Sequence, residues 1–173
     1  MTEVAATDAA TDVECGRPVT AAGAVRTVAP SPRYIELRCR TAFSFLDGVS
    51  LPEDLVDRAA ALDYDTVAIG DRDGLYGAPR AFKAASAAGL RALVGADVAI
   101  AAGRLYLLAI DRQGYRNLCR LITTGKLRAP KGECRLGWND LAEHAAGLIA
   151  LATGGADGVL GTCDGPTARA TLD

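Results

Sequence analysis

The sequence predicts an α/β fold built around a largely parallel sheet. Between residues 34 and 152, short apolar runs typical of strands alternate with segments in which apolar residues recur at helical spacing. Two Asp-Gly pairs, at 47–48 and 73–74, supply turns after the first two apolar runs. Because strands and helices alternate along the chain, strand–helix–strand units are favoured over an all-helical or all-β architecture.

Two strand–helix units are predicted in the first half of this region. Residues 34–39 and 66–70 are predicted strands, because both are short and rich in apolar residues. Each is followed by a predicted helix, over 50–62 and over 78–88. Ser50 fits the N-cap of the first helix, where a hydroxyl satisfies a free backbone N–H.

The second half contains shorter predicted elements. Strands are predicted at 92–95, 97–101, 104–110 and 148–152, and helices at 115–124 and 138–145. Five or so strand–helix units are too few to close an eight-stranded barrel of ~250 residues. If the sheet curls into a barrel, we therefore expect an incomplete one.

Composition divides the chain into three segments. Residues 1–32 lack periodicity and end in the proline-containing APSPR, which predicts a disordered leader. Residues 33–155 form the predicted domain, and residues 156–173 are a predicted irregular tail. The sequence opens without the basic region of a signal peptide, and its most apolar stretch is interrupted by charges, so we expect no membrane span.

Charge and cysteine content narrow the class of protein. The formal net charge is −2, which provides no global basic field for nucleic acid. The five cysteines are scattered without a Cys-x-x-Cys pair, so we expect a reducing, cytoplasmic compartment. The single histidine, His144, excludes an enzyme built on a histidine cluster, and we expect it at a helix end or in the core. Cys39 is expected to be an inert strand thiol.

Charged side chains gather where the predicted strands end. In α/β folds, functional residues lie at the carboxyl ends of strands. The residues at these places are four arginines and four aspartates, without histidine: Arg38, Arg40, Arg72, Arg104, Asp47, Asp71, Asp73 and Asp97.

Five successive motifs carry a resemblance to a known family. They are YIELRCRTAFSFLDG, DTVAIGDRDGLYG, LVGADVAI, RLYLLAIDRQGYRNLCRLIT and GLIALATGG, over about residues 34–155. Together they resemble the amino-terminal domain of bacterial C-family DNA polymerases (DNA polymerase III alpha-subunit family), and most of all the error-prone type. That domain belongs to the PHP (polymerase and histidinol phosphatase) superfamily. The resemblance implies a distorted (β/α) barrel, here incomplete with about five strands of the usual seven.

The resemblance also implies a metal site that this chain has lost. Family members hold divalent metals such as Zn or Mn with histidines and carboxylates. At the matching positions the carboxylates Asp47 and Asp97 are kept, and four histidines are replaced by Arg38, Arg40, Arg72 and Arg104. A guanidinium offers no lone pair to a cation and stays protonated. We therefore expect no bound metal, no cofactor and no catalytic residue in this chain.

Two roles are open for the four arginines. The favoured one is a salt-bridged remnant of the site, in which arginines pair with the vacated carboxylates, and Asp71 and Asp73 are further candidate partners. The alternative is a pocket for phosphate or for a nucleic-acid backbone. The aspartates argue against the second role because they neutralise such a pocket.

A basic stripe is predicted on the helix that starts near residue 115. Arg112, Arg116 and Arg120 are four residues apart and so lie on one face. This stripe is either a solvated helix face or a contact with DNA or a polymerase core.

The most direct functional interpretation is the amino-terminal PHP-domain fragment of an error-prone DNA polymerase. Replication, translesion synthesis and repair are the roles that the resemblance implies for the full-length family. One alternative is a stand-alone PHP-superfamily metal-dependent phosphoesterase, and another is a module that binds DNA or a polymerase. No small-molecule substrate is predicted.

Overall fold

The computed structural model of the 173-residue chain describes residues 34–152, 154 and 158–159. The chain divides into two units, residues 1–31 and 32–173, and every described residue belongs to the second. The predicted leader and most of the predicted tail lie outside the described residues. None of the helices in the described part of the chain has the length and apolar composition needed to cross a membrane.

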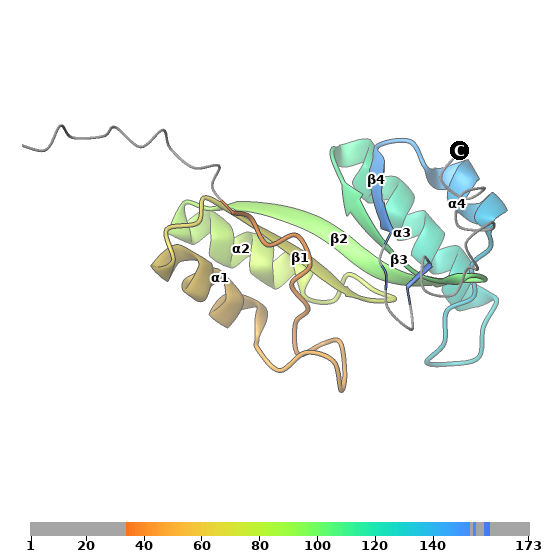
Figure 1. Cartoon of the computed structure of the whole chain (residues 1–173), viewed down its shortest axis with the longest axis horizontal. Coiled ribbons are helices and arrows are strands. Elements are labelled where there is room, and N and C mark those ends of the chain that lie inside the picture. The colour runs from red at the N-terminus through yellow and green to blue at the C-terminus, as the bar shows by residue number, and fades with distance from the viewer. Residues whose placement is uncertain (1–33, 153, 155–157, 160–173) are drawn as a thin grey trace, which may run out of the picture. The chain divides into compact units, whose positions relative to one another are not determined.

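Four helices and four strands make up the described region (Figure 1). In chain order they are α1 (Pro52–Ala61), β1 (Thr66–Arg72), α2 (Ala78–Ala88), β2 (Arg91–Ile100), β3 (Gly103–Ala109), α3 (Arg112–Leu127), α4 (Trp138–His144) and β4 (Leu148–Ala152). The strands form one sheet in the order β1-β2-β3-β4. The predicted α/β class is confirmed, and the open sheet is consistent with an incomplete barrel.

The sheet is less parallel than predicted. β1 and β2 are parallel, but β2 pairs with β3 and β3 pairs with β4 in antiparallel fashion. Two residues, 101–102, separate β2 from β3, and so short a connection can join only antiparallel strands. The expectation of a largely parallel sheet was therefore wrong for two of the three strand pairs.

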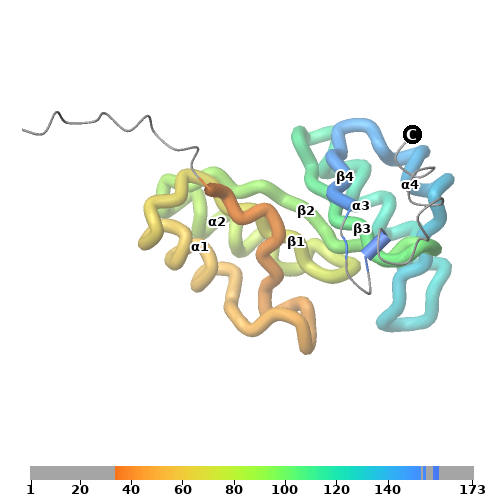
Figure 2. Tube along the Cα trace, in the orientation of Figure 1, coloured from red at the N-terminus to blue at the C-terminus, as the bar shows by residue number. Residues whose placement is uncertain are grey.

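The predicted first strand, 34–39, is not a regular strand. It runs beside β1 (Figure 2) and forms a single parallel bridge between Cys39 and Ile69. Its other backbone contacts are few: the Ala68 N–H donates to the Glu36 carbonyl at 3.4 Å, and the Gly70 N–H donates to the Cys39 carbonyl at 2.9 Å. These contacts are enough to place the end of the segment beside the end of β1.

Several element boundaries also differ from the prediction. The strands expected at 92–95 and 97–101 are one strand, because Ala96 pairs with neighbours on both sides. The helix expected at 115–124 begins at Arg112, since the Asp111 carboxylate caps it by accepting from the Gly114 N–H at 2.7 Å. The N-cap of α1 is Leu51 rather than Ser50.

The helices α1, α2 and α3 pack against one face of the sheet. Val67 and Ile69 of β1 are buried under α1 and α2, while Val98 and Leu107 of β2 and β3 are buried under α3. The pairing register puts these residues on the same face, because side chains alternate between faces along a strand. The opposite face carries a smaller buried cluster of Ala68, Tyr106 and Leu108.

Candidate functional site

The candidate site lies where the parallel strands β1 and β2 end. Arg72, the last residue of β1, is in register with Asp97 of β2. Arg104 at the start of β3 is paired with Ala99 of β2, so its side chain lies on the same face as Asp97. The segment beside β1 adds two further arginines, and the loop that follows adds Asp47. Residues far apart in the sequence therefore meet at this corner of the sheet.

Asp97 is the centre of the cluster. Its side chain is only 2% exposed, yet it contacts three guanidinium groups. Arg38 lies 3.5 Å away, Arg104 donates from Nε at 3.1 Å, and Arg40 forms a close ion pair with the same carboxylate. A buried carboxylate is costly unless it is paired and hydrogen-bonded. The three guanidiniums supply that compensation.

Arg104 links Asp97 to a second carboxylate. Its two terminal nitrogens donate to Asp73 at 3.4 and 3.3 Å, and both side chains are nearly buried. The Asp73 carboxylate also accepts from the Ala99 N–H at 2.8 Å, which fixes its orientation against β2. The Arg104 guanidinium therefore lies between the carboxylates of Asp73 and Asp97, where it supplies positive charge to both.

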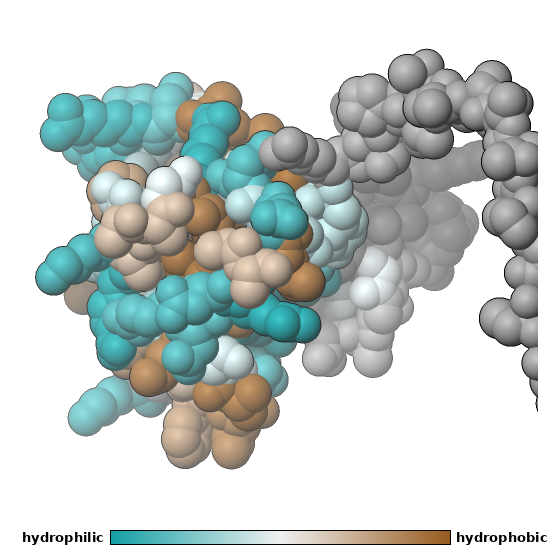
Figure 3. All heavy atoms as spheres, turned by 90° about the vertical axis from the view of Figure 1, so that its left-hand side faces the viewer, coloured by the Kyte–Doolittle hydropathy of each residue, from teal (hydrophilic) through white to brown (hydrophobic). Residues whose placement is uncertain are grey.

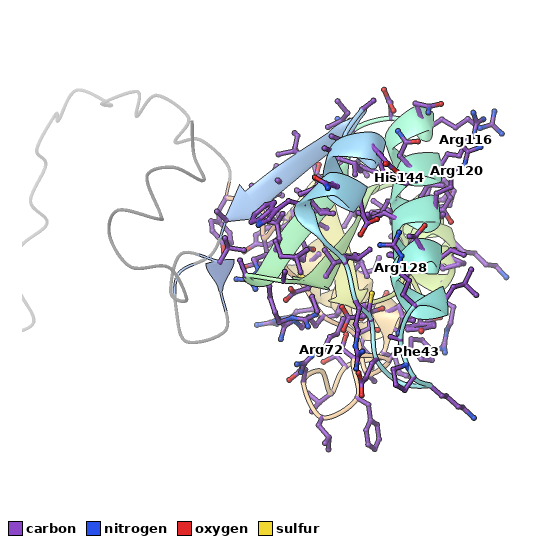
Figure 4. All side chains as sticks on the ribbon, turned by 90° about the vertical axis from the view of Figure 1, so that its right-hand side faces the viewer. Phe43, Arg72, Arg116, Arg120, Arg128 and His144 are labelled. Atoms are coloured by element: carbon purple, nitrogen blue, oxygen red, sulfur yellow. The ribbon has the colours of Figure 1, made fainter. Side chains whose placement is uncertain are left out.

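Asp47 forms the outer part of the cluster. Arg72 donates to it at 2.7 Å, and Arg40 lies 3.6 Å away, so Arg40 connects Asp47 to Asp97. The hydrogen bond from Arg72, together with the charges of Arg72, Arg40 and Arg104, lowers the pKa of Asp47 below its ordinary value. Figure 4 shows Arg72 near the loop that carries Phe43.

Asp71, a candidate partner of the arginines, instead accepts hydrogen bonds from neutral groups. It is in register with Ala96, so it points to the helix-covered face, whereas the arginine cluster lies on the other face. There it accepts hydrogen bonds from the Thr41 N–H and hydroxyl at 2.9 Å, from the Ser44 hydroxyl at 2.8 Å and from the Gly77 N–H at 2.8 Å. Asp71 therefore anchors the loop after the first segment to the start of α2.

Tyr106 is a member of the site that sequence reasoning missed. It is opposite Asp97 in the hairpin and is 1% exposed, with the Arg38 guanidinium 5.5 Å above its ring. Its ring lies against Gly70, where an added Cβ would overlap the hydroxyl. The Tyr106 hydroxyl is buried without a hydrogen-bond partner among the described residues. Tyr106 could be placed in the site only from the pairing of β2 with β3, which puts it opposite Asp97.

The residues present do not fit a divalent metal. Among the described residues, no group of three or more His, Cys, Asp or Glu side chains is placed to hold one. The positions around Asp97 are filled by guanidiniums, which carry positive charge and offer no lone pair. No catalytic step through a metal can be derived from this arrangement.

The basic stripe is separate from this cluster. Arg112, Arg116 and Arg120 are exposed on α3, and Figure 4 shows Arg116 and Arg120 projecting away from the sheet. Arg116 donates to Gln113 at 3.2 Å. No carboxylate within the described residues pairs with any of the three.

Cys39 and His144 lie in surroundings that favour a structural role over a catalytic one. Burial raises the pKa of the Cys39 thiol to about 11, which disfavours the reactive thiolate. His144 ends α4, and its Nδ1 lies 2.9 Å from the Asp140 carbonyl.

The loop between residues 41 and 51 carries exposed apolar side chains. Phe45, Leu46 and Val49 are more than four-fifths exposed. Figure 3, which views the side that carries α1, shows hydrophobic side chains open to solvent between hydrophilic ones.

Comparison with known proteins agrees with the motifs. A sequence model of the PHP domain matches residues 36–172. An error-prone DNA polymerase of Rhodopirellula baltica is 46% identical over 119 residues, and one of Pseudomonas aeruginosa is 44% identical over 119 residues. These matches cover 68% of this chain but only 10% and 12% of those polymerases.

A solved structure is also similar in part. It is an amidohydrolase from Chromobacterium violaceum with bound sulfate and no metal, 27% identical, with a TM-score of 0.46. The match covers 54% of this chain and 33% of that chain.

Proposed function

Because this chain belongs to the PHP domain family, we propose that it is the amino-terminal PHP domain of an error-prone DNA polymerase and that it has no catalysis of its own. Its similarity to such polymerases, at 44–46% identity, supports this assignment. In that setting it supports replication and translesion synthesis or repair in the cytoplasm, without a small-molecule substrate.

One observation carries the non-catalytic part of the proposal. The buried Asp97 carboxylate is already neutralised by Arg38, Arg40 and Arg104. A cation bound there would have to displace guanidiniums that are covalently part of the chain. Arginine therefore replaces the metal as the positive charge that holds the strand ends together.

The stand-alone phosphoesterase is the weaker candidate. Hydrolysis in a metal-dependent enzyme needs an ion that activates water or polarises the phosphoryl group. Asp47 and Asp97 alone do not make up a typical ligand set. Both are engaged by arginine, so neither is free to hold an ion.

Metal analysis of two proteins tests this replacement. The wild-type chain, purified without chelator, is expected to contain well under one Zn or Mn per chain. A variant with Arg38→His, Arg40→His, Arg72→His and Arg104→His restores imidazole donors beside Asp47 and Asp97 and is expected to bind Zn or Mn. Elemental analysis after gel filtration measures both.

The matched control carries four histidines elsewhere. Arg58→His, Arg91→His, Arg116→His and Arg135→His change the same number of charges at exposed positions on separate segments outside the cluster. This control is expected to stay free of stoichiometric metal. Near one equivalent of Zn or Mn in the wild-type chain would contradict the proposal and revive the phosphoesterase.

A second experiment tests the polymerase assignment. The Rhodopirellula polymerase lacking its matching 119 residues is co-expressed with this chain and purified by a tag on the polymerase. We expect the two proteins to form a stoichiometric complex with more primer extension than the truncated polymerase alone. Absence of any complex, with a truncated polymerase that still unfolds cooperatively, would argue against a role in a polymerase.

A further inference from the structure

A hollow lies between α2 and α3 on the helix-covered side of the sheet. Its volume is about 540 Å³, and β2 forms its floor. Large apolar side chains line it while remaining exposed: Phe82 is 61% exposed, Ile110 57% and Tyr115 42%. Exposed apolar side chains gathered around one hollow are typical of an interaction site rather than of ordinary surface.

A second hollow continues along the same face of α3. It has a volume of about 320 Å³ and is lined by Cys119 and Lys126 of α3 and by Tyr76 of the loop before α2. Tyr115, Cys119 and Lys126 follow one another on one side of the helix. We call the two hollows together the α3 groove. Because α3 has 16 residues, the groove follows a helix of about 24 Å, the length of a four-turn partner helix.

The cations around the α3 groove have no internal counter-charge. Arg91 and Arg112 line the first hollow, Lys126 lines the second, and Arg116 is on the adjacent surface of α3. Among the described residues, none of these four has an ion pair with a carboxylate. Asp111 is the one acidic residue lining the hollows, and it is occupied by capping the Gly114 N–H. The groove is therefore apolar inside and positively charged along its rim.

The apolar interior and the positively charged rim of the α3 groove indicate which kind of partner would fit it. An apolar groove matches the apolar stripe of an amphipathic helix, and cations along the rim match carboxylates that flank such a stripe. Nucleic acid fits less well, because phosphate contacts explain the arginines but leave Phe82 and Ile110 exposed. The error-prone polymerases that resemble this chain are roughly ten times longer than the matched region, so most of such a protein lies outside this structure.

We propose that the α3 groove docks an acidic amphipathic helix of the polymerase body. This inference rests on the proposed function and names the surface through which it operates. The apolar stripe of the helix covers Phe82, Ile110 and Tyr115, and its carboxylates pair with Arg112 and Arg116.

The complex described above provides the test. The dissociation constant of labelled chain and truncated Rhodopirellula polymerase is measured for the wild type and two groove variants. Phe82→Ser with Ile110→Ser removes the apolar contacts, and Arg112→Glu with Arg116→Glu reverses the rim charge. Each variant is expected to bind about tenfold more weakly or worse, as for residues at the centre of an interface. Added salt should weaken the wild type more than the charge variant.

Matched controls separate docking from general damage. Leu62→Ser removes an apolar side chain that is 46% exposed at the C-cap of α1 and lines neither hollow, and Arg58→Glu reverses an exposed cation of α1. Both are expected to bind like the wild type. All variants should keep the wild-type melting temperature, since the changed side chains are exposed.

Three outcomes would overturn the inference while leaving the proposed function intact. In one, the wild type binds and the groove variants bind equally well. In another, hydrogen exchange shows protection on binding at residues 43–51 and none along α3. In the third, nuclease treatment abolishes the complex, which makes DNA the ligand. A wild-type chain that does not bind the polymerase at all instead contradicts the proposed function.

Discussion

Two groups of arginines in this molecule have opposite surroundings. At the strand ends, Arg40 and Arg104 each contact two carboxylates of the same chain. On α3, Arg112, Arg116 and Arg120 are exposed, and none has a carboxylate partner among the described residues. We therefore expect the same residue type to serve two purposes. Where the counter-charge is internal, we expect arginine to stabilise the folded structure, and where it is absent among the described residues, we propose that arginine pairs with a partner.

The largest loss of stability that would test this contrast between the two groups of arginines is expected from removing Asp97, the central carboxylate. Asp97→Ala leaves three guanidiniums close together without their anion, and breaking a buried ion pair from one side costs about 3–5 kcal/mol. We expect a loss of about that size in the free energy of unfolding, measured by urea denaturation. Asp57→Ala, which removes an exposed carboxylate of α1, is the control and should change little. A loss below 1 kcal/mol for Asp97→Ala would mean that the cluster is not structural.

A smaller loss of stability is expected from overpacking the contact between Gly70 and the Tyr106 ring. Gly70→Ala places a Cβ against the buried Tyr106 hydroxyl and ring, and overpacking of this kind costs about 1–3 kcal/mol. Adding Tyr106→Phe removes the nearest atom and should recover part of the loss. Tyr106→Phe alone should be neutral or slightly stabilising, because the lost hydroxyl has no hydrogen-bond partner. Urea denaturation of the three variants measures these differences, and a destabilised Tyr106→Phe would reveal a partner for the hydroxyl.

The outer ion pair between Asp47 and Arg72 should contribute less to the free energy of unfolding, and its contribution should disappear in acid. The pKa of Asp47 is lower in the folded protein than its ordinary value of 3.8. A carboxyl of this kind adds stability that is present above the unfolded pKa and is lost as pH falls through the folded pKa. Asp47→Asn should therefore cost less than about 1 kcal/mol at neutral pH, since Arg72 is partly exposed. The difference between the variant and the wild type in urea denaturation should begin to shrink near pH 3.8 and vanish only below the folded pKa. A difference that persisted in acid would require another cause.

The smallest effect on stability is expected on α3. Arg116→Ala with Arg120→Ala removes two exposed cations without internal carboxylate partners, so the free energy of unfolding should change by less than about 0.5 kcal/mol. The same double variant should bind the truncated polymerase more weakly. A clear loss of stability in the isolated chain would erase the distinction between the two groups of arginines.

The sequence was sufficient for the elements with strong local signals. The alanine-rich helix at 78–88 and the strand at 148–152 were predicted with their observed bounds. The hairpin direction of β2 and β3 was missed, although the predicted strands at 97–101 and 104–110 leave only two residues between them, too few to join parallel strands. The first segment was misread since its apolar pattern resembles a strand, while the structure gives it only one bridge to β1.

The candidate site was partly visible in the sequence. The arginines and aspartates at the ends of the first two predicted strands were expected to meet, because strand ends share one edge of a sheet, whereas Asp97 and Arg104 open predicted strands. Which aspartate meets which arginine depends on the face that each residue occupies. Asp71 and Arg72 are neighbours in sequence, yet strand alternation sends Asp71 to Thr41 and Ser44 and leaves Arg72 beside Asp47.

The order of strands in the sheet follows the order of the chain, and this has a consequence for synthesis on the ribosome. Each strand pairs with the one made just before it, so the sheet can grow as the chain emerges. The ion pairs of Arg38 and Arg40 with Asp97 cannot form until β2 has been made. Arg38 and Arg40 precede Asp97 by 59 and 57 residues, and at ~5–20 residues per second they await it for roughly 3–12 s. During that interval the nascent chain carries the two cations uncompensated by Asp97, and the cluster is complete only when Arg104 at the start of β3 has also been made.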